Sequence, residues 1–417
     1  MQLKRVVVTG LGIVSPLGNN KVDFWKNLVA GVSGAAPITL FDASKFKTQF
    51  ACEVKGFDPT DHMDRKEARK MDRFAQFAIA CSNEAIQDSG FVNNKTDLDE
   101  VGVIWGAGIG GMDTFTSEAM GFAENGYSPR FNPFFIPKVI SDIAPGHISI
   151  RHGFRGMNFT TVSACASSTN ALIDALNYIR LGKTKVIVAG GSEATVGVSG
   201  IGGFNAMHAL STRNDSPQTA SRPFDKDRDG FVMGEGGACI VVEELEHALE
   251  RGATIYAELA GGGMSADAHH LTAPHPEGLG AKKVMERTLE DAGMRPEEVD
   301  YINVHGTSTP LGDVAEAKAI EQVFGDHAYS LNISSSKSMT GHLLGAAGAM
   351  EATATILAVQ HGVIPPTINH FTDDPDLNPE LNFTFNTAQH RTVRSALSNT
   401  FGFGGHNASV LFKTYTE

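Results

Sequence analysis

Residues 162–172 read Val-Ser-Ala-Cys-Ala-Ser-Ser-Thr-Asn-Ala-Leu and join a β-type run to an Ala-rich helix predicted over about residues 166–181. The small side chains around Cys165 let the backbone turn sharply from strand to helix. The positive end of the helix dipole then points at the sulfur, which predicts a lowered thiol pKa and a nucleophilic cysteine. The alternative is a buried structural cysteine, and the choice depends on what the rest of the chain brings beside it.

The length and composition indicate a layered globular protein in a reducing compartment. The 417 residues suffice for two similar-sized units. The four cysteines lie far apart and form no CxxC pair, which argues against a disulfide framework or a zinc site and favours the cytoplasm. The first residues lack the apolar run of a secretory leader, no segment has the length of a membrane span, and the formal charge of −13 disfavours nucleic acid as a partner.

Two glycine-rich segments resemble nucleotide-binding loops without meeting their requirements. In residues 5–18, RVVVTGLGIVSPLG, Gly10 and Gly12 suggest a turn, but Ser15 replaces the third glycine of a dinucleotide fingerprint. Residues 106–111, GAGIGG, follow a buried-type strand and satisfy GxGxxG, yet no second strand ending in an acidic residue comes after them. We therefore expect the second segment to be a close-packed loop that lines a pocket.

A basic stripe is predicted along one helix near the N-terminus. Apolar spacing predicts a helix over residues 64–88 with Asp64 as its N-cap. Four positive side chains recur at helical spacing on its opposite face: Lys66, Arg69, Lys70 and Arg73. Such a stripe is usually a solvated surface, but on an acidic protein it also suits docking of an acidic partner.

The chain repeats one pattern of elements in two halves. Residues 160–183 give strand, sharp turn, small-residue helix and glycine, and residues 334–362 give the same order. In this repeat, Cys165 of the first half and His342 of the second half occupy equivalent positions. A duplication of βα units brings two equivalent helix starts together about a pseudo-twofold axis.

Two histidine motifs lie in the second half. His305 follows a buried-type strand over residues 299–304, and active sites of α/β proteins gather at such strand ends. His342 is predicted at a helix start, where the dipole disfavours protonation and the imidazole stays neutral. Either histidine alone is more often structural, but with Cys165 they form a candidate triad.

These motifs resemble those of the β-ketoacyl-acyl-carrier-protein synthases of type II, which have the thiolase fold. The matching segments cover essentially the whole chain: residues 162–168, 305–313, 337–342 and 399–405. The resemblance implies an α/β, thiolase-like fold with duplicated βα halves in a five-layer αβαβα arrangement. It also implies that residues 1–250 carry the nucleophile and residues 251–417 carry the two histidines.

The activity implied by the resemblance is a decarboxylative condensation that elongates fatty acyl chains. The Cys165 thiolate takes an acyl group from an acyl carrier protein, and malonyl-carrier then loses carbon dioxide to give an enolate that attacks the acyl-enzyme. The N–H groups of His305 and His342 stabilise the enolate, and the backbone N–H groups of Cys165 and Phe403 stabilise the acyl oxyanion. Lys337 and Glu351 match the supporting pair of the family. No cofactor and no metal are implied.

The resemblance also assigns binding residues. Three hydroxyl residues, Thr272, Thr307 and Thr309, match substrate-binding positions, the latter two for the pantetheine arm, and Ile109, Phe204 and Phe403 match the acyl-pocket wall. Residues 130–145 are too apolar for a free loop and predict an interface or a pocket lid; Phe135 within them matches the segment that reaches the partner's pocket in a homodimer. Lys66, Arg69 and Lys70 match the carrier-facing surface. The sequence departs from the family at His406 and His208. The first departure leaves undecided how the loop at His406 opens, and the second how strongly the carrier binds at the entrance near His208.

Three alternatives remain beside this reading. A polyketide-type ketosynthase has the same triad. A non-catalytic partner of the chain-length-factor kind lacks the nucleophile, whereas Cys165 is present. A dinucleotide oxidoreductase is suggested only by the two glycine-rich segments, and we expect no nicotinamide binding.

Overall fold

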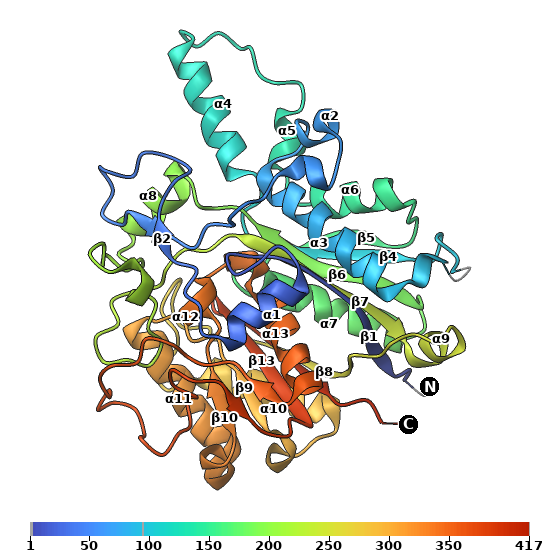
Figure 1. Cartoon of the computed structure of the whole chain (residues 1–417), viewed down its shortest axis with the longest axis vertical. Helices are drawn as coiled ribbons and strands as arrows, with labels where there is room; N and C mark the ends of the chain where they lie inside the picture. The colour runs from blue at the N-terminus through green and yellow to red at the C-terminus, as the bar shows by residue number, and fades with distance from the viewer. Residues whose placement is uncertain (1–2, 94–95, 417) are drawn as a thin grey trace.

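The computed structural model describes residues 3–93 and 96–416, and its centre is one large mixed sheet (Figure 1). The strands of its first half are β1 (Val6–Val14), β4 (Gly102–Gly106), β5 (Asn158–Thr161), β6 (Val186–Glu193) and β7 (Gly236–Glu244). Those of its second half are β8 (Ala257–Ala266), β9 (Tyr301–Asn303), β10 (Asn332–Ser334), β13 (Ser395–Gly402) and β14 (His406–Lys413).

The two halves of the sheet have the same topology. The strand order is β10-β9-β13-β14-β8-β1-β7-β6-β4-β5. If the five strands of each half are numbered along the chain, both halves show the order third, second, fourth, fifth, first from the outer edge of the sheet to its middle. In each half the third, second and fourth strands are parallel, and the fifth is antiparallel to its two neighbours. The halves meet where β1 pairs with β8, at Val7 with Glu258 and Val8 with Ala257. This symmetry confirms the predicted duplication.

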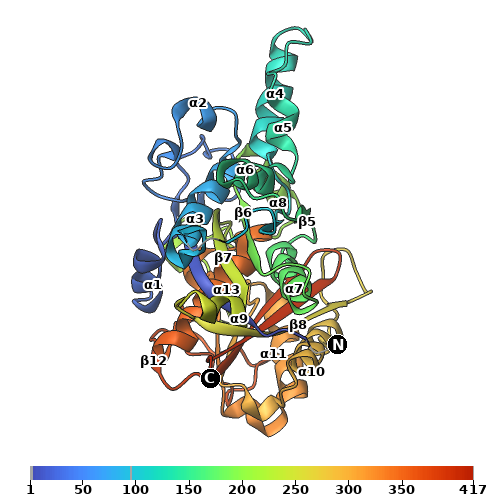
Figure 2. The same cartoon turned by 90° about the vertical axis from the view of Figure 1, so that its right-hand side faces the viewer.

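Helices cover both faces of the sheet and also lie between its halves (Figure 2). The outer helices of the first half are α3 (Arg73–Ser89) and α6 (Ile143–His152), and those of the second half are α10 (Leu279–Ala292) and α11 (Pro310–Phe324). Between the halves lie α7 (Ser167–Arg180) and α13 (Ala347–His361), each following the third strand of its half. The five layers predicted by the resemblance are therefore present.

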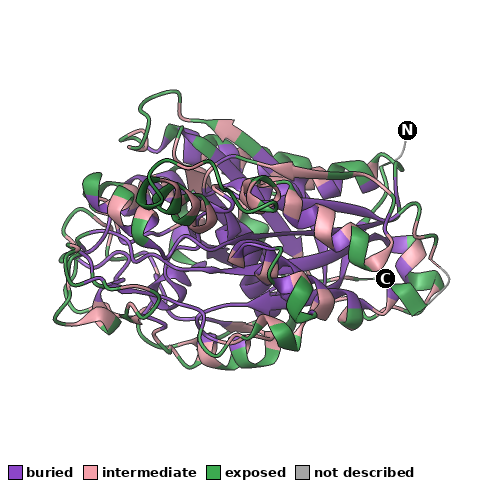
Figure 3. Cartoon of the chain, turned by 90° about the horizontal axis from the view of Figure 1, so that it is seen from above, coloured by how far each residue is buried: buried purple, intermediate pink, exposed green. Residues whose placement is uncertain are grey.

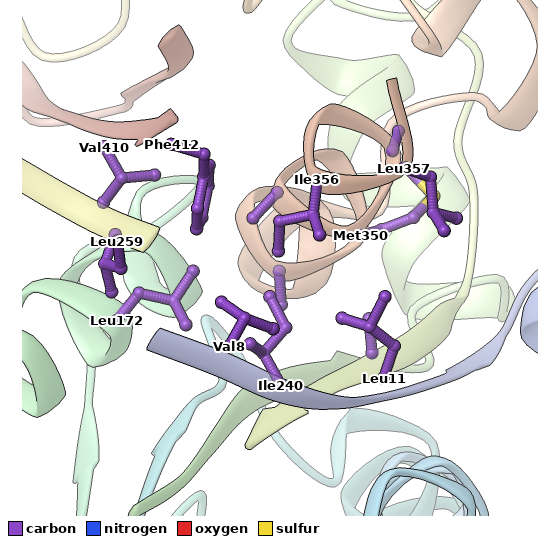
Figure 4. Packing of buried hydrophobic residues seen from close by; sticks show 14 of the residues in the cluster. Val8, Leu11, Leu172, Ile240, Leu259, Met350, Ile356, Leu357, Val410 and Phe412 are labelled. Carbon is purple, nitrogen blue, oxygen red and sulfur yellow. The ribbon is translucent and has the colours of Figure 1, made fainter. Parts of the chain in front are cut away.

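The core between the two halves is built around α7 and α13. Leu172 of α7 and Met350 and Ile356 of α13 pack with side chains from both halves (Figure 4): Val8, Leu11, Ile240, Leu259, Val410 and Phe412. From Ala347 to Val359 every residue of α13 is buried, which is why this helix is mainly apolar, with Glu351 as its one acidic side chain. Seen from above, the purple strands lie inside a rim of partly exposed helices (Figure 3).

The remaining elements lie outside the large sheet and the helices named above. The other α-helices are α1 (Lys21–Val29), α2 (Arg65–Ala68), α4 (Met112–Glu124), α5 (Phe135–Val139), α8 (Val198–Ala206), α9 (Leu245–Glu250) and α12 (Lys337–Thr340). Two-residue strands form two ribbons: β2 (Ala36–Pro37) with β3 (Phe50–Ala51), and β11 (Val363–Ile364) with β12 (Gln389–His390). Figure 1 shows α4 standing out from the body as an arm.

The turn suggested by Gly10 and Gly12 is wrong. Both glycines lie inside the continuous strand β1, and helix α3 crosses directly over them. A Cβ atom would lie 2.3 Å from the Ala85 oxygen at position 10 and 2.0 Å from the Cys81 oxygen at position 12. The glycines therefore permit close helix packing rather than a turn. Met1 and Gln2, the start of the predicted N-terminal run, lie outside the described residues.

The single helix predicted over residues 64–88 is also wrong. Asp64 does cap a helix, but that helix is the short α2, and Asp72 caps the separate helix α3. The Asp72 side chain accepts a hydrogen bond from the Phe74 amide at 3.3 Å, so a new helix starts there. Arg73 leaves the predicted stripe because it pairs with the buried Glu235 at 2.7 Å.

Candidate active site

Cys165 lies at the sharp turn between β5 and α7, as the small residues predict. The Ala164 backbone adopts φ 50°, and the Ser163 amide donates to the Ser167 hydroxyl at 2.9 Å. The turn packs closely against β4, because a Cβ at Gly106 would lie 2.3 Å from the Ser168 nitrogen. These contacts fix Cys165 at the wall of a cavity of about 590 Å³.

Both predicted histidines reach the same cavity. The Nε2 atom of His342 lies 3.0 Å from the Cys165 Sγ, and the His305 and His342 rings lie 5.3 Å apart at 87°. His305 follows β9, and its backbone N–H donates to Glu316 Oε1 at 2.9 Å. One sulfur and two imidazoles therefore converge at the end of one cavity.

His342 lies just before a helix start, as predicted. The 3-10 turn η6 (Leu344–Ala346) begins two positions after it and leads directly into α13. The His342 backbone N–H donates to the Val232 oxygen at 2.7 Å, as part of an isolated bridge with Met233. A strand-like contact with the first half therefore positions this ring.

The predicted lowering of the Cys165 pKa is wrong. Burial raises the pKa of the Cys165 thiol to about 12, against the opposing effects of the Lys337 charge and the Phe403 backbone N–H. Removal of water from around the enclosed sulfur disfavours its charged form. The sulfur is therefore a thiol, with a proton acceptor 3.0 Å away in His342.

The two imidazoles are neutral, as predicted. Burial lowers the pKa of His305 and of His342 well below the ordinary value, and the nearby Lys337 charge lowers both further. Each ring therefore presents one N–H donor and one acceptor nitrogen. Neutral donors stabilise a developing negative charge without forming an ion pair with the substrate.

Lys337 and Glu351 form a buried pair beside the histidines. The Lys337 ammonium donates to Glu351 Oε1, and the two side chains are 1% and 0% exposed. Burial raises the pKa of Glu351 to about 7, although Lys337 opposes this shift. Each charge of such a pair depends on the other, because either one alone is costly inside a protein.

Replacing only one member of this pair is expected to destabilise the fold. Lys337→Met leaves the Glu351 carboxylate uncompensated and should lower the free energy of unfolding by about 3 kcal/mol or more. Urea denaturation followed by circular dichroism measures this loss. The matched double variant Lys337→Met/Glu351→Leu should regain most of the stability, and equal stability of the single and double variants would contradict a mutually dependent pair.

Two backbone N–H groups lie near the sulfur. The Phe403 backbone N–H favours negative charge on the Cys165 sulfur and so opposes part of the rise in its pKa. A Cβ at Gly402 would lie 3.0 Å from the Cys165 nitrogen, so the end of β13 needs glycine to approach this closely. The chain at Phe403 therefore follows directly after a contact with the Cys165 backbone.

Most of the predicted binding residues line the cavity. They are Ile109, Phe204, Thr272, Thr307, Thr309 and Phe403, together with His208 at the exposed edge. The Thr307 and Thr309 hydroxyls lie 3.0 Å apart. The 106–111 segment is the expected pocket-lining loop, since Gly108 and Ile109 form part of the wall.

Phe135 does not reach this cavity. It stacks on Phe131 with ring centroids 5.4 Å apart and packs against Phe115 of the α4 arm. None of the described residues 130–145 lines the cavity, so this segment does not act as its lid within one chain. His406 lies outside the cavity wall as well, at the exposed start of β14 with its ring against Gly404.

Two buried glutamates were not predicted as part of the site. Glu316 accepts the backbone N–H groups of His305 and Gly306, and Glu193 accepts those of Gly108, Ile109, Gly110 and Gly345. Burial raises the pKa of both carboxyls to about 7. The available signal was an acidic residue ending a run of buried strand character, as in residues 186–193.

The described chain offers little else for a ligand of another class. Across residues 3–93 and 96–416, no cluster of three or more His, Cys, Asp or Glu side chains has a metal-binding arrangement. No helix of this part of the chain is both long and apolar enough to cross a membrane.

The fold and the Cys-His-His arrangement define a condensing enzyme of the thiolase fold. Two family models match the chain: "Beta-ketoacyl synthase, N-terminal domain" over residues 3–248 and "Beta-ketoacyl synthase, C-terminal domain" over residues 256–371. The chain therefore belongs to the β-ketoacyl synthase family.

Among its relatives are proteins named 3-oxoacyl-[acyl-carrier-protein] synthase 2. The chain is 50% identical over 412 residues to the one from Coxiella burnetii and 48% identical over 415 residues to the one from Synechocystis sp.. These alignments cover 99% and 100% of this chain, respectively, and 99% of each relative.

Solved structures give the same picture. A β-ketoacyl synthase from Burkholderia phymatum superposes with a TM-score of 0.92 at 35% identity, covering 99% of this chain and all of that one. The ishigamide ketosynthase/chain length factor and the complex AntDE:AntF, a type II polyketide carrier protein with its ketosynthase, both give 0.91 at 35% and 31% identity over the same coverage.

Proposed function

We propose that this chain is a 3-oxoacyl-[acyl-carrier-protein] synthase that elongates fatty acyl chains by decarboxylative condensation. The observation that carries the proposal is the meeting of the Cys165 thiol with two neutral imidazoles in one cavity, at 3.0 Å for His342 and 5.3 Å between the two rings. The relatives at 48% and 50% identity bear the name of this activity.

In the first half-reaction, the Cys165 sulfur attacks the carbonyl carbon of an acyl-carrier thioester. Because the thiol pKa is raised to about 12, attack requires the thiol proton to leave as the S–C bond forms. His342 Nε2 accepts this proton and returns it to the departing carrier sulfur. The Cys165 and Phe403 amides donate to the acyl oxygen while it carries negative charge.

In the second half-reaction, malonyl-carrier binds with its thioester oxygen facing His305 and His342. The bond to the carboxylate breaks, carbon dioxide leaves, and the electron pair becomes an enolate. Its oxygen accepts the N–H of His305 and that of His342, whose single ring proton now sits on Nε2, since the acylated sulfur no longer donates to that nitrogen. The enolate carbon attacks the acyl carbonyl of the acyl-enzyme. The Cys165 thiolate departs and takes up one proton from water, leaving the 3-oxoacyl group on the carrier.

The experiment that tests this function uses the full chain with purified acyl carrier protein. Intact-protein mass spectrometry should show one acyl group on Cys165 after incubation with acyl-carrier. Addition of malonyl-carrier should then release carbon dioxide and give a carrier lengthened by one two-carbon unit. Acylation without any 3-oxoacyl product would overturn the proposal.

A polyketide ketosynthase is the second candidate, because one structurally similar complex is named as a type II PKS carrier protein with its ketosynthase. Sequence identity favours the fatty-acid function, at 48–50% against 31%. The same experiment separates the two, since a polyketide enzyme would add several malonyl units to its product without reduction between additions.

We propose that the acyl carrier protein docks on the surface formed by Lys66, Arg69 and Lys70. All three are exposed, around and after the short helix α2, on a protein whose net charge is −13. The Lys70 ammonium also lies over the Phe134 ring at 5.4 Å, which connects this surface with the α5 segment. A local basic patch attracts an acidic partner that the rest of the surface repels.

Reversing this patch should affect carrier-bound substrates alone. The variant Lys66→Glu/Arg69→Glu/Lys70→Glu is expected to raise KM for acyl-carrier about tenfold at low salt, because attraction becomes repulsion. KM for a short thioester without carrier should not change. The control reverses three cations of the outer helix α10, namely Lys282, Lys283 and Arg287. Equal effects of the two triple variants would contradict docking at this surface.

We also propose a homodimer formed around the α4 arm. Large apolar side chains are exposed there: Phe115 (56%), Met120 (52%), Tyr127 (71%), Phe131 (43%), Phe134 (39%) and Ile136 (60%). A cluster of this kind on a soluble enzyme is typical of a covered interface. In such a dimer Phe135 would reach the partner's pocket. Each copy would then contain both halves, residues 1–250 with the nucleophile and residues 251–417 with the two histidines. The four free, buried cysteines are consistent with a reducing compartment such as the cytoplasm.

A further inference from the structure

Glu193 connects two walls of the cavity without touching the cavity itself. It ends β6 and is fully buried, and its two carboxylate oxygens accept four backbone N–H groups. Oε2 accepts from Gly108 at 2.7 Å and Gly345 at 3.2 Å, while Oε1 accepts from Gly110 at 3.1 Å; the Ile109 N–H is shared between both. We call this set of contacts the carboxylate bridge.

The carboxylate bridge fixes two side chains that face the substrate. Ile109 lies in the middle of the bridged loop, and Leu344 directly precedes the bridged Gly345. Both side chains line the cavity and belong to the same apolar cluster as Cys165. Leu344 has φ 49°, a conformation that a leucine adopts only when its surroundings impose it.

The two bridged segments are packed in direct backbone contact, with no room for a side chain between them. A Cβ at Gly345 would lie 2.2 Å from the Gly108 nitrogen and 2.6 Å from Glu193 Oε2. Each segment therefore has a glycine where the two touch, and the backbone N–H groups of both segments share one carboxylate as their hydrogen-bond acceptor. Loss of that acceptor leaves buried N–H groups unpaired, which forces the segments to move.

We propose that Glu193 is a positioning residue that fixes the acyl-binding wall and thereby sets selectivity among acyl chain lengths. The inference rests on the proposed condensing function and deepens it. Glu193 does not contact the reacting atoms. It acts through Ile109 and Leu344, whose positions determine how much of a long chain fits beside Cys165.

The test compares acylation of Cys165 by butanoyl-, dodecanoyl- and hexadecanoyl-carrier in the full-length protein. Glu193→Gln keeps the side-chain volume but replaces one accepting oxygen by an NH₂ donor. The ratio of kcat/KM between the best and the poorest chain should fall about tenfold. Malonyl decarboxylation should stay within about twofold of the unmodified protein, because the two histidines are untouched.

A second variant and a matched control complete the design. Gly345→Ala introduces a Cβ into the same contact and should flatten the chain-length profile in the same way. Glu243→Gln alters an equally buried carboxylate on the neighbouring strand β7, where it binds His247 and Arg251. This control should lower the melting temperature and leave the chain-length ratio unchanged.

An unchanged ratio in folded Glu193→Gln or in folded Gly345→Ala would overturn the inference, and so would an equal shift in Glu243→Gln. Failure of the underlying function gives a different result, since the unmodified protein would then take up no acyl group of any length.

Discussion

Cys165→Ala should take up no acyl group and form no condensation product, whereas malonyl-carrier should still lose carbon dioxide at a measurable rate. The reason is a division of labour: the sulfur is needed for the acyl-enzyme, but the enolate is stabilised by the two imidazoles, which remain. Intact-protein mass spectrometry measures acylation, and conversion of malonyl-carrier to acetyl-carrier measures decarboxylation.

The matched control for this prediction is Cys239→Ala. Cys239 is also fully buried but lies on β7, away from the cavity wall. It should retain acylation with at most a small loss of stability. Acylation of the Cys165→Ala variant at any residue, with product formed, would remove Cys165 from its proposed role.

His305→Ala and His342→Ala should each lower the rate of malonyl decarboxylation by about 10²–10³-fold. Each variant removes one neutral N–H donor from a buried site, where a hydrogen bond to a developing negative charge is worth more than in water. Acylation should fall less in His305→Ala than in His342→Ala, because only the latter ring lies 3.0 Å from the sulfur. Stopped-flow release of carbon dioxide and burst acylation separate the two steps.

His361→Ala is the control for the histidine variants. His361 ends α13 and stacks on Trp25 at 5.4 Å, so its loss removes an imidazole without changing the cavity. Its decarboxylation rate should equal that of the unmodified protein. Normal decarboxylation in both active-site variants would refute the role of the imidazoles as donors.

The elements that could be predicted are those with strong local signals. The helix predicted over about residues 166–181 is observed as Ser167–Arg180. The turn at Cys165 followed from its small neighbours, and the duplication followed from the repeated order of strand, turn and helix. The pairing of Lys337 with Glu351 followed from the resemblance and from the cost of a lone charge in an apolar helix.

The predictions that failed depended on contacts between distant segments. Gly10 and Gly12 resemble turn residues until α3 is known to cross them, and Arg73 resembles a surface cation until Glu235 is known to face it. The Cys165 pKa depends on burial by the whole cavity rather than on its own helix. Glu193 was missed because its four donors come from two segments far from it in the chain.

The location of α7 and α13 between the halves also has a consequence for biosynthesis. The ribosome completes the residues around Cys165 long before it makes β13 and β14, yet the Phe403 amide lies between these two strands, and β14 supplies Val410 and Phe412 to the common core. We therefore expect the nascent chain to stay without acyltransfer activity until residues 395–413 leave the exit tunnel. Until then the apolar side of α7 needs temporary cover, which makes the growing chain a client for a chaperone.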